Sequence, residues 1–395
     1  MIHQNSISKR ALGLKASMTL EISSLAQELK KNGKNICSLS AGEPDFDTPT
    51  FIIEAAKKAL DEGITRYGPA AGDPCLREAI AHKLLTINKV PSTKENILIT
   101  NGGKQAIFNL FQILLDPGDE VLIPSPYWLS YPDIARFAQG KPIIVDALAE
   151  NGFSLDISKM ESQISPQTKI LILNSPCNPT GKVMKLKELE AIAELLRRHP
   201  HIYVVSDEIY EFIISEEERH ISIAQLAEDI KERIFIVNGF AKAWAMTGWR
   251  IGYLYGNETI IKKATALQSQ STSNVCSFAQ KGALAAVQEQ PSGIDYMINS
   301  YNKRRNLLTE GLKGIKELIV HEQSGAFYSF PQLRGNLPGS LDFCKMALEE
   351  EGLAMVPGIA FGQDNCIRLS CSASDETIND GLDRLKRLIE RLMNQ

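Results

Sequence analysis

A lysine and an arginine lie close together in a segment whose pattern suits the binding of a phosphorylated aldehyde. Lys242 follows the apolar run Ile234 to Val237, which is typical of a buried strand, after a turn at Gly239. An amine at a strand end projects into a partly desolvated pocket, and desolvation favours its neutral, nucleophilic form. Arg250 then offers a guanidinium fork that suits phosphate oxygens. The segment therefore predicts covalent capture of an aldehyde that also carries a phosphate.

A Gly-Gly turn after another predicted strand could bind that phosphate. The run Ile97 to Thr100 ends in Asn101-Gly102-Gly103-Lys104-Gln105, and a helix is predicted to follow. The free N–H groups and the positive dipole end of such a helix start favour an anion. The turn matches neither the nucleoside triphosphate loop nor the dinucleotide fingerprint, so those ligands lose support. A plain strand-to-helix connection is the alternative interpretation.

Two further apolar runs, Lys169 to Leu173 and Ile202 to Val205, are predicted strands that end in polar side chains. These side chains are Asn174, Asn178, Asp207 and Tyr210. Because ligands of open α/β sheets bind beyond the carboxyl ends of the strands, we expect these side chains to meet at one edge. Taken singly, an Asn-Pro pair is a turn former and an Asp after a strand is a helix cap. Together with the lysine and the arginine, the set matches a pyridoxal ring, which needs an acid beside its nitrogen and donors for its hydroxyl oxygen.

Two aromatic residues have a similar double interpretation. Trp128 follows a further strand end and could stack on a flat ring, and Tyr67 lies in a turn-rich segment. As isolated residues both are more typical of packing than of ligand contact. Trp244 and Trp249 are assigned to packing.

Composition favours small-molecule chemistry. The chain has 395 residues, of which 44% are hydrophobic and 23% charged, and its formal net charge is −4. Neither a nucleic acid nor a membrane partner is expected from these values. The seven cysteines are scattered without a Cys-x-x-Cys pair, so no metal site is predicted and a reducing compartment is indicated. With no signal-peptide core and no apolar run long enough to cross a bilayer, we expect a cytoplasmic protein.

The order of predicted elements indicates an α/β protein. Between about residues 95 and 260, short apolar runs alternate with helical stretches, which is typical of a wound, mostly parallel sheet covered by helices. Other expected elements are a helix over Leu20 to Leu29, a strand over Ile36 to Leu39, a helix over Leu186 to Arg198, a long helical region from about residue 257 to Ala286 and beyond, strands near Ala326 to Ser329 and Ile367 to Ser370, and a final amphipathic helix. We expect a large central domain and a smaller one built from both chain ends.

These motifs resemble those of class I aminotransferases of the aspartate aminotransferase superfamily, the fold-type I enzymes that use pyridoxal 5'-phosphate. The resemblance covers nearly the whole chain. The motifs that carry it are Gly42-Glu43-Pro44-Asp45, Tyr67, Gly102-Gly103-Lys104-Gln105, Trp128, Asn178-Pro179-Thr180-Gly181, Asp207 to Tyr210, Lys242 to Arg250, and Arg368. It implies an N-terminal arm and part of the small domain over residues 1–50, a large cofactor-binding domain over residues 51–290, and a small α+β domain over residues 291–395.

The resemblance also implies a role for each matching residue. Lys242 would be the catalytic lysine that holds the cofactor, Asp207 would keep the pyridine nitrogen protonated, and Trp128 would stack on the ring. Asn178 and Tyr210 would contact the phenolic oxygen. The phosphate would be held by the turn that contains Gly103, Lys104 and Gln105, by Arg250, and by Tyr67 from a second subunit. This last role implies a homodimer with shared active sites.

For the amino acid and 2-oxo acid substrates, the resemblance assigns Arg368 and the backbone at Gly42 to the α-carboxylate, next to Trp128 and Asn178. The nearest subgroup comprises the bacterial and plant aspartate aminotransferases that also use prephenate. There Lys104 and Thr19 would meet the distal carboxylate, and Lys15 would be associated with prephenate. Lys15 and Thr19 also fit an ordinary role as solvated residues at a helix start. Gly239 and Ala241 stand where many relatives have serines, and Ala16 stands where the subgroup often has proline.

The predicted function is ping-pong transamination of L-aspartate with 2-oxoglutarate, giving oxaloacetate and L-glutamate, with conversion of prephenate to arogenate as a further reaction. Lys242 would carry the substrate α-proton as general base and acid. Alternatives are an aminotransferase for alanine or aromatic amino acids and a pyridoxal-dependent C–S β-lyase. An effector-sensing module that binds the ligand without turnover is the alternative from another class.

Overall fold

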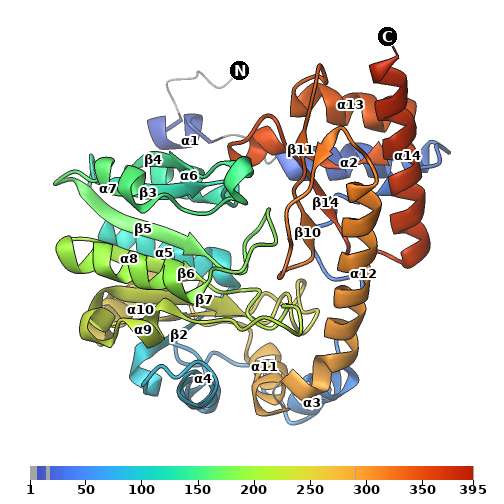
Figure 1. Cartoon of the computed structure of the whole chain (residues 1–395). Helices are drawn as coiled ribbons and strands as arrows, with labels where there is room; N and C mark the ends of the chain where they lie inside the picture. The colour runs from blue at the N-terminus through green and yellow to red at the C-terminus, as the bar shows by residue number, and fades with distance from the viewer. Residues whose placement is uncertain (1–6, 15–17, 290, 395) are drawn as a thin grey trace.

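The central feature of the computed structural model, which describes residues 7–14, 18–289 and 291–394, is a seven-stranded mixed sheet (Figure 1). Its strand order is β2 (Ile97–Thr100), β8 (Gly252–Tyr255), β7 (Ile234–Gly239), β6 (Tyr203–Asp207), β5 (Thr168–Asn174), β3 (Glu120–Ser125), β4 (Lys141–Asp146). Only β8 runs antiparallel to its neighbours. The predicted α/β class with a mostly parallel sheet is therefore confirmed.

Helices cover both faces of this sheet, as the alternating pattern predicts. One face is covered by α5 (Gly103–Leu114), α6 (Ser130–Phe137) and α10 (Glu258–Ser269). The other face is covered by α4 (Pro74–Thr86), α7 (Ile157–Ser162), α8 (Leu186–Arg198), α9 (Ile223–Leu226) and α11 (Ser277–Glu289), with α3 (Thr50–Asp61) packed against α11. Because both faces are covered, the strands can consist of nearly continuous apolar residues, and β2 and β7 are buried throughout.

Segments from both chain ends form smaller sheets beside the central one (Figure 1). β1 (Cys37–Ser38) pairs in parallel with β12 (Leu353–Ala354), and β14 (Ile367–Ser370) pairs antiparallel with β10 (Tyr328–Ser329) and β13 (Val356–Pro357). A last pair joins β9 (Leu318–Ile319) and β11 (Gln332–Leu333). The helices of this part are α2 (Met18–Lys31), α12 (Asp295–Lys313), α13 (Ser340–Glu350) and α14 (Asp375–Met393). α1 (Lys9–Leu12) lies against α6 of the central part instead.

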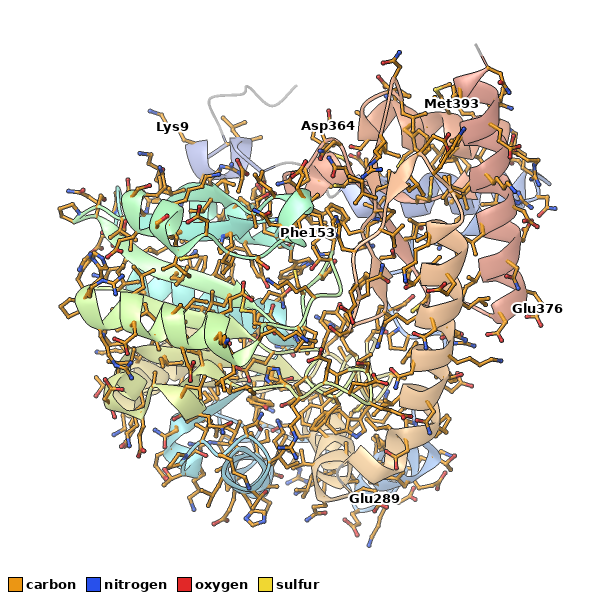
Figure 2. The ribbon with its side chains drawn as sticks, in the orientation of Figure 1. Lys9, Phe153, Glu289, Asp364, Glu376 and Met393 are labelled. Atoms are coloured by element: carbon orange, nitrogen blue, oxygen red, sulfur yellow. The ribbon has the colours of Figure 1, made fainter. Side chains whose placement is uncertain are left out.

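Aromatic packing joins the two parts. Phe153, which follows β4, has its ring centroid 5.7 Å from that of Phe330 and 5.1 Å from that of His321 (Figure 2). Phe330 in turn packs edge-on against Phe361 at 5.7 Å. Edge-to-face and tilted contacts at these distances stabilise such a junction beyond the area that they bury.

Two details of the elements differ from the sequence prediction. The helical region predicted after residue 257 is divided into two helices, α10 and α11, because the chain turns between them and Ser273 takes a positive φ of 60° that no helix accommodates. In addition, β8 was not predicted, since its four residues follow the lysine–arginine segment without a separate turn signal. The strands expected at Ile97–Thr100 and Ile367–Ser370 and the helix at Leu186–Arg198 have the predicted bounds.

Close packing of glycine backbones fixes the start of β8 against the Gly-Gly turn. A Cβ atom on Gly252 would lie 2.6 Å from both the carbonyl carbon of Gly102 and the nitrogen of Gly103. No side chain fits at such a distance. Glycine at position 252 therefore allows the start of β8 to approach the Gly102-Gly103 turn this closely.

We predict that Gly252→Ala lowers the free energy of unfolding by about 1–3 kcal/mol, as for other overpacked sites, because the turn must move to admit the methyl group. The measurement is urea unfolding followed by circular dichroism. Gly248→Ala is the matched control, since a Cβ there meets nothing within 4 Å. Equal unfolding midpoints for the two variants would contradict this packing argument.

Candidate active site

The carboxyl ends of three neighbouring strands bring the predicted polar residues together. Asn174 at the end of β5 is in register with Asp207 at the end of β6, and Asp207 is in register with Val237 of β7. Lys242 follows β7. These strand ends open into a cleft of about 710 Å³. Of the predicted site residues, those that line it are Gly42, Gly103, Lys104, Trp128, Asn178, Asp207, Tyr210, Lys242, Arg250 and Arg368.

The amine of Lys242 lies inside the cleft, where its Nζ donates a hydrogen bond to the carbonyl oxygen of Gly42. It also lies 5.8 Å from the ring centroid of Tyr210. Burial lowers the pKa of Lys242 to about 8, and the positive charges of Arg368 and Arg250 act in the same direction. This lysine therefore holds a substantial neutral fraction near neutral pH, as a nucleophile and general base requires.

Asp207 is buried at the back of the cleft and is held by two donors. The hydroxyl of Tyr131 donates to its Oδ2 at 2.7 Å, and the main-chain N–H of Ile209 donates to its Oδ1 at 3.3 Å. Burial raises the pKa of Asp207 to about 6, against the effect of these hydrogen bonds. Burial also keeps the pKa of Tyr131 well above its usual value, so this phenol stays a donor. A buried carboxylate of this kind suits a cationic ring nitrogen as its partner.

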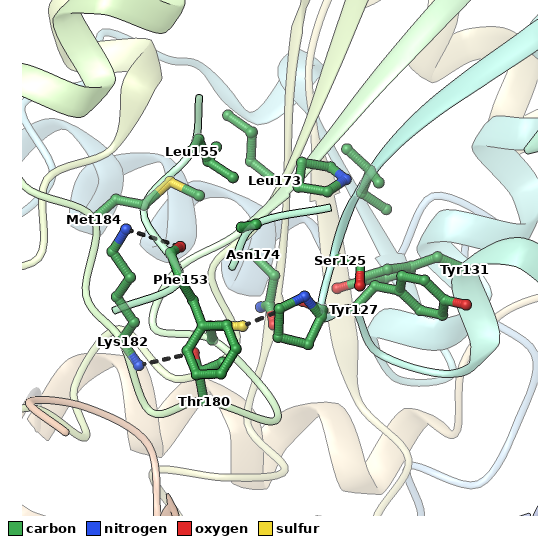
Figure 3. Close-up of a pocket in the computed structure, with 15 residues that line it drawn as sticks. Ser125, Tyr127, Tyr131, Phe153, Leu155, Leu173, Asn174, Thr180, Lys182 and Met184 are labelled. Carbon is green, nitrogen blue, oxygen red and sulfur yellow. Dashed lines mark hydrogen bonds between the residues drawn. The ribbon is translucent and has the colours of Figure 1, made fainter. Parts of the chain in front are cut away.

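Tyr131 lies in α6, three residues after Trp128, and the sequence analysis did not identify it as a site residue. Its ring meets that of Trp128 edge-on, with centroids 5.3 Å apart. Tyr131 and Asn174 line both the main cleft and a smaller cavity behind it (Figure 3). Phe153, Leu155 and Met184 line the far side of that cavity, so the wall of the cleft has largely apolar support.

Arg368 is a buried guanidinium with polar neighbours but no acidic partner. The side chain is 3% exposed, its Nη1 donates to Asn178 Oδ1 at 3.0 Å, and its Nη2 donates to the carbonyl oxygen of Ser40 at 3.0 Å. Its guanidinium carbon lies 4.4 Å from the ring centroid of Tyr328. Over the described residues, no carboxylate lies within ion-pair distance of Arg368, and its Nε has no hydrogen-bond partner. A buried cation left in this state is a strong site for a carboxylate ligand.

Hydrogen bonds between side chains fix the remaining cleft residues. Asn174 accepts from the N–H of Asn178 at 2.8 Å and donates from Nδ2 to the carbonyl oxygen of Asp207 at 2.9 Å. The hydroxyls of Tyr210 and Tyr328 lie 2.9 Å apart. Tyr328 belongs to β10, in the part of the chain built from the C-terminal segment, and the sequence analysis did not identify it either.

The Gly-Gly turn and Arg250 form an anion cradle at the start of α5. Gly102 precedes the helix with a φ of 79°, and a Cβ on it would lie 2.7 Å from Arg250 Nη2. Arg250 is held by hydrogen bonds from Nη1 to the carbonyl oxygen of Thr247 at 2.9 Å and from Nη2 to that of Asn101 at 3.3 Å. The first-turn N–H groups of a helix have no partner within the helix. The backbone N–H groups of Gly103 and Lys104 are therefore available to bind an anion together with the Arg250 guanidinium.

Lys104 and Gln105 leave the same turn in different directions. The ammonium of Lys104 lies 4.9 Å from the ring centroid of Trp128, and burial together with Arg250 lowers its pKa. Gln105 does not line the cleft. Its Oε1 accepts from the N–H of Asn101 at 2.6 Å and its Nε2 donates to Thr272 at 2.8 Å, so its side chain braces the turn.

Two predicted residues, Tyr67 and Gln105, do not line the cleft of this single chain. Tyr67 is 92% exposed. Thr19 lies in the first turn of α2, with its side chain outside what the structure describes, and Lys15 lies outside the described residues.

At Gly239, a Cβ would approach the Cα of Gly252 to 2.7 Å, which gives a steric reason for glycine in place of serine.

A mostly parallel wound sheet with an amine, a carboxylate and two arginines at its carboxyl edge defines the class of fold-type I pyridoxal 5'-phosphate-dependent transferases. Comparisons with known proteins agree. The family model described as "Aminotransferase class I and II" matches residues 34–385. A Rickettsia felis protein named "Probable aspartate/prephenate aminotransferase" is 43% identical and covers 96% of each chain, and the "Aspartate aminotransferase" of Bacillus subtilis is 41% identical over 98% of this chain and 99% of its own.

Solved structures give the same result. The aspartate aminotransferase of Thermus thermophilus with maleate has a TM-score of 0.93 and 43% identity, covering 97% of this chain and 99% of its own. The Rhizobium meliloti aspartate aminotransferase has a TM-score of 0.94 at 37% identity, covering 98% and 99%. This chain belongs to the class I and II aminotransferases, a family of pyridoxal 5'-phosphate-dependent enzymes.

The lowered pKa of Lys242 predicts how fast cofactor-free protein captures pyridoxal 5'-phosphate as the pH changes. Only the neutral amine attacks an aldehyde, so the capture rate should rise about tenfold per pH unit below the pKa and level off above about pH 8. Stopped-flow absorbance measures this rate. Glu43→Gln should move the midpoint to lower pH, because the Glu43 charge raises the pKa of Lys242. A midpoint above pH 10 in the unaltered chain would contradict the argument.

Proposed function

We propose that this chain transaminates L-aspartate with 2-oxoglutarate, giving oxaloacetate and L-glutamate, and also converts prephenate to arogenate. The observation that carries this proposal is the pair of cations in one cleft with Lys242. Arg368 is buried without an acidic partner, and Lys104 provides a second cation beside Trp128. Two cations suit a substrate that carries two carboxylates. The relatives named above are an aspartate/prephenate and an aspartate aminotransferase, and the Thermus structure holds maleate, a dicarboxylate.

The cleft residues fit pyridoxal 5'-phosphate. Lys242 would hold its aldehyde carbon, Asp207 would face the pyridine nitrogen, and the cradle of Gly103 and Arg250 would hold the phosphate. Trp128 would stack on the ring, with Asn178, Tyr210 and Lys104 as the remaining proposed cofactor contacts. Gln105, predicted as a further contact, would support the phosphate turn through its bonds to Asn101 and Thr272. When bound, this cofactor supplies an electron sink that lets the α-proton of an amino acid leave.

The chain's own groups would then perform the reaction. Arg368, with Asn178 and the backbone at Gly42, binds the α-carboxylate and holds the substrate Cα near Lys242. Once the amino group of the substrate replaces Lys242 on the aldehyde carbon, the freed neutral amine of Lys242 would accept the proton from Cα and return it to the adjacent carbon of the cofactor, acting as base and then as acid. Asp207, fixed by Tyr131, would keep a negative charge opposite the ring nitrogen during this transfer. Water would then release the keto acid while the amino group stays behind, and the second keto acid would take up that group as the same residues act in reverse.

We predict that Lys242→Ala abolishes transamination of aspartate, because no other amine in the described part of the cleft lies at the strand end after β7. The measurement is oxaloacetate formation with 2-oxoglutarate as acceptor. Lys262→Ala is the control, since it removes a lysine from the exposed face of α10 and should keep full activity with aspartate. Full activity of Lys242→Ala would refute this assignment.

Lys104 should distinguish dicarboxylic from other substrates. We predict that Lys104→Ala lowers kcat/KM for aspartate by about 10- to 150-fold, the value of one charge-assisted hydrogen bond, and changes that for alanine far less. Lys262→Ala, on the exposed face of α10, is the control. Equal losses for aspartate and alanine would instead favour an alanine or aromatic aminotransferase or a C–S β-lyase. Thr19 and Lys15 stay proposed contacts of the distal carboxylate and of prephenate.

A homodimer with shared sites is also part of the proposal. Tyr67 is exposed in one chain although its motif is that of a phosphate contact, which supports contact with the cofactor of a second copy. We predict that Tyr67→Phe weakens pyridoxal 5'-phosphate binding by about 3- to 15-fold, the value of one hydrogen bond, without changing the mass in sedimentation equilibrium. A monomeric unaltered chain would contradict the shared site.

The domain division follows the same reasoning. We propose residues 51–290 as the cofactor-binding domain, with residues 1–50 and 291–395 forming the arm and the small domain. This division is supported by the pairing of β1 with β12, which joins the two ends of the chain.

No helix in the described residues is long and apolar enough to span a membrane. All seven cysteines are free, which supports a cytoplasmic location.

A further inference from the structure

Glu208 follows Asp207 in the chain and is buried on the side away from the cleft. Its side chain is 1% exposed, and it does not line the cleft that Asp207 lines. Its main-chain N–H donates to the carbonyl oxygen of Val237 at 2.9 Å, so the pairing of β6 with β7 continues past Asp207. A second carboxylate therefore lies beside Asp207 in the interior, where charges interact more strongly than in water.

Three side chains donate to this carboxylate. The hydroxyls of Ser206 and Ser222 donate to Glu208 Oε1 at 2.9 and 2.7 Å, and His220 Nε2 lies 3.0 Å from Oε2. Burial acts to raise the pKa of Glu208, but His220 and the two hydroxyls bring it below its usual value. Glu208 is thus an ionised group that ties the segment before α9 to the end of β6.

His220 can change the net charge of this pair. Its side chain is 6% exposed, and because an ionised Glu208 only accepts, Nε2 must donate to it. Nδ1 has no hydrogen-bond partner in the described residues. A second proton on Nδ1 would bring the net charge of the pair from −1 to zero.

The other charges nearby are compensated or are neutral phenols and thiols. Glu211, which approaches Glu208 and His220, pairs with Lys83 and accepts from Asn88 at 2.8 Å and Asn238 at 2.7 Å. The titratable groups that face Asp207 are Tyr131, Cys177, Glu208, Tyr210 and Lys242, and those that face Glu208 are Asp207, His220, Glu211 and Tyr253. Glu208 with His220 is therefore the variable charge that lies behind Asp207.

We propose that Glu208 and His220 are positioning residues for Asp207, holding its strand end from behind and setting the charge next to which it ionises. This inference rests on the proposed function, in which ionised Asp207 pairs with the cofactor's ring nitrogen. The negative charge of Glu208 makes it harder for Asp207 to lose its proton. Cofactor affinity then depends on pH through residues that never touch the cofactor.

The test measures the dissociation constant of pyridoxal 5'-phosphate by equilibrium dialysis of the full chain at several pH values from 7.5 to 5. At each pH, the dissociation constant of the variant is divided by that of the unaltered protein. Titration of the cofactor's own phosphate cancels in this ratio. For Glu208→Gln, removal of the charge lowers the pKa of Asp207 from about 6. If the pKa of Asp207 falls by about one unit, about five times more of the variant has Asp207 ionised at pH 5 than of the unaltered protein. The ratio of the two dissociation constants should therefore fall about fivefold from pH 7.5 to pH 5.

Ser222→Ala is the structural control, since it removes a hydrogen bond to Glu208 and leaves every charge. Its ratio should be flat with pH, as should that of Glu216→Gln in the exposed part of the same segment.

A ratio for Glu208→Gln that is as flat with pH as those of the controls would overturn the inference and leave the proposed function intact. If the unaltered chain binds no pyridoxal 5'-phosphate at any pH, the proposed function fails and this inference fails with it.

Discussion

The charge balance around the Lys242 amine is the constraint on which the rest of the site depends. Two arginines, Arg250 and Arg368, and burial in the cleft favour the neutral amine, whereas Glu43 and Asp207 favour the ammonium. Burial has the largest effect, and together with the two arginines it outweighs the two carboxylates and lowers the pKa of Lys242 to about 8. In the proposed function the same arginines would bind the two anionic groups of the ligands, so one arrangement would both bind anions and activate the amine.

Holding these charges together requires backbone segments that approach closely. Gly102, Gly239 and Gly252 meet where side chains would collide, and this contact sets the anion cradle beside the strand that carries Lys242. Asp207 is fixed between Tyr131 in front and Glu208 behind. Arg368 reaches the cleft from β14, in the part of the chain that follows the central sheet. The substrate site therefore lies between two parts of the molecule that aromatic packing around Phe330 joins.

The central sheet and most of the cleft could be predicted from the sequence. Apolar runs mark the strands, and in a parallel sheet the residues after each run must share one edge, so Asp207, Asn178 and Lys242 could be placed without tertiary information. Tyr131 and Tyr328 could not, because their contacts with Asp207 and Tyr210 arise from how α6 and β10 pack. Gln105 has the right sequence position, but its side chain turns toward Thr272. The roles of Tyr67, Thr19 and Lys15 stay predictions, since one depends on a second copy and the others on an N-terminal segment only partly described.

The central claim is that one amine in this chain forms an imine with pyridoxal 5'-phosphate. The most direct measurement is borohydride reduction of the purified protein, followed by trypsin digestion and mass spectrometry of the peptides. We expect a stoichiometric phosphopyridoxyl adduct on Lys242 and only substoichiometric adducts on other lysines. An unmodified Lys242, or a stoichiometric adduct on another lysine, would contradict it.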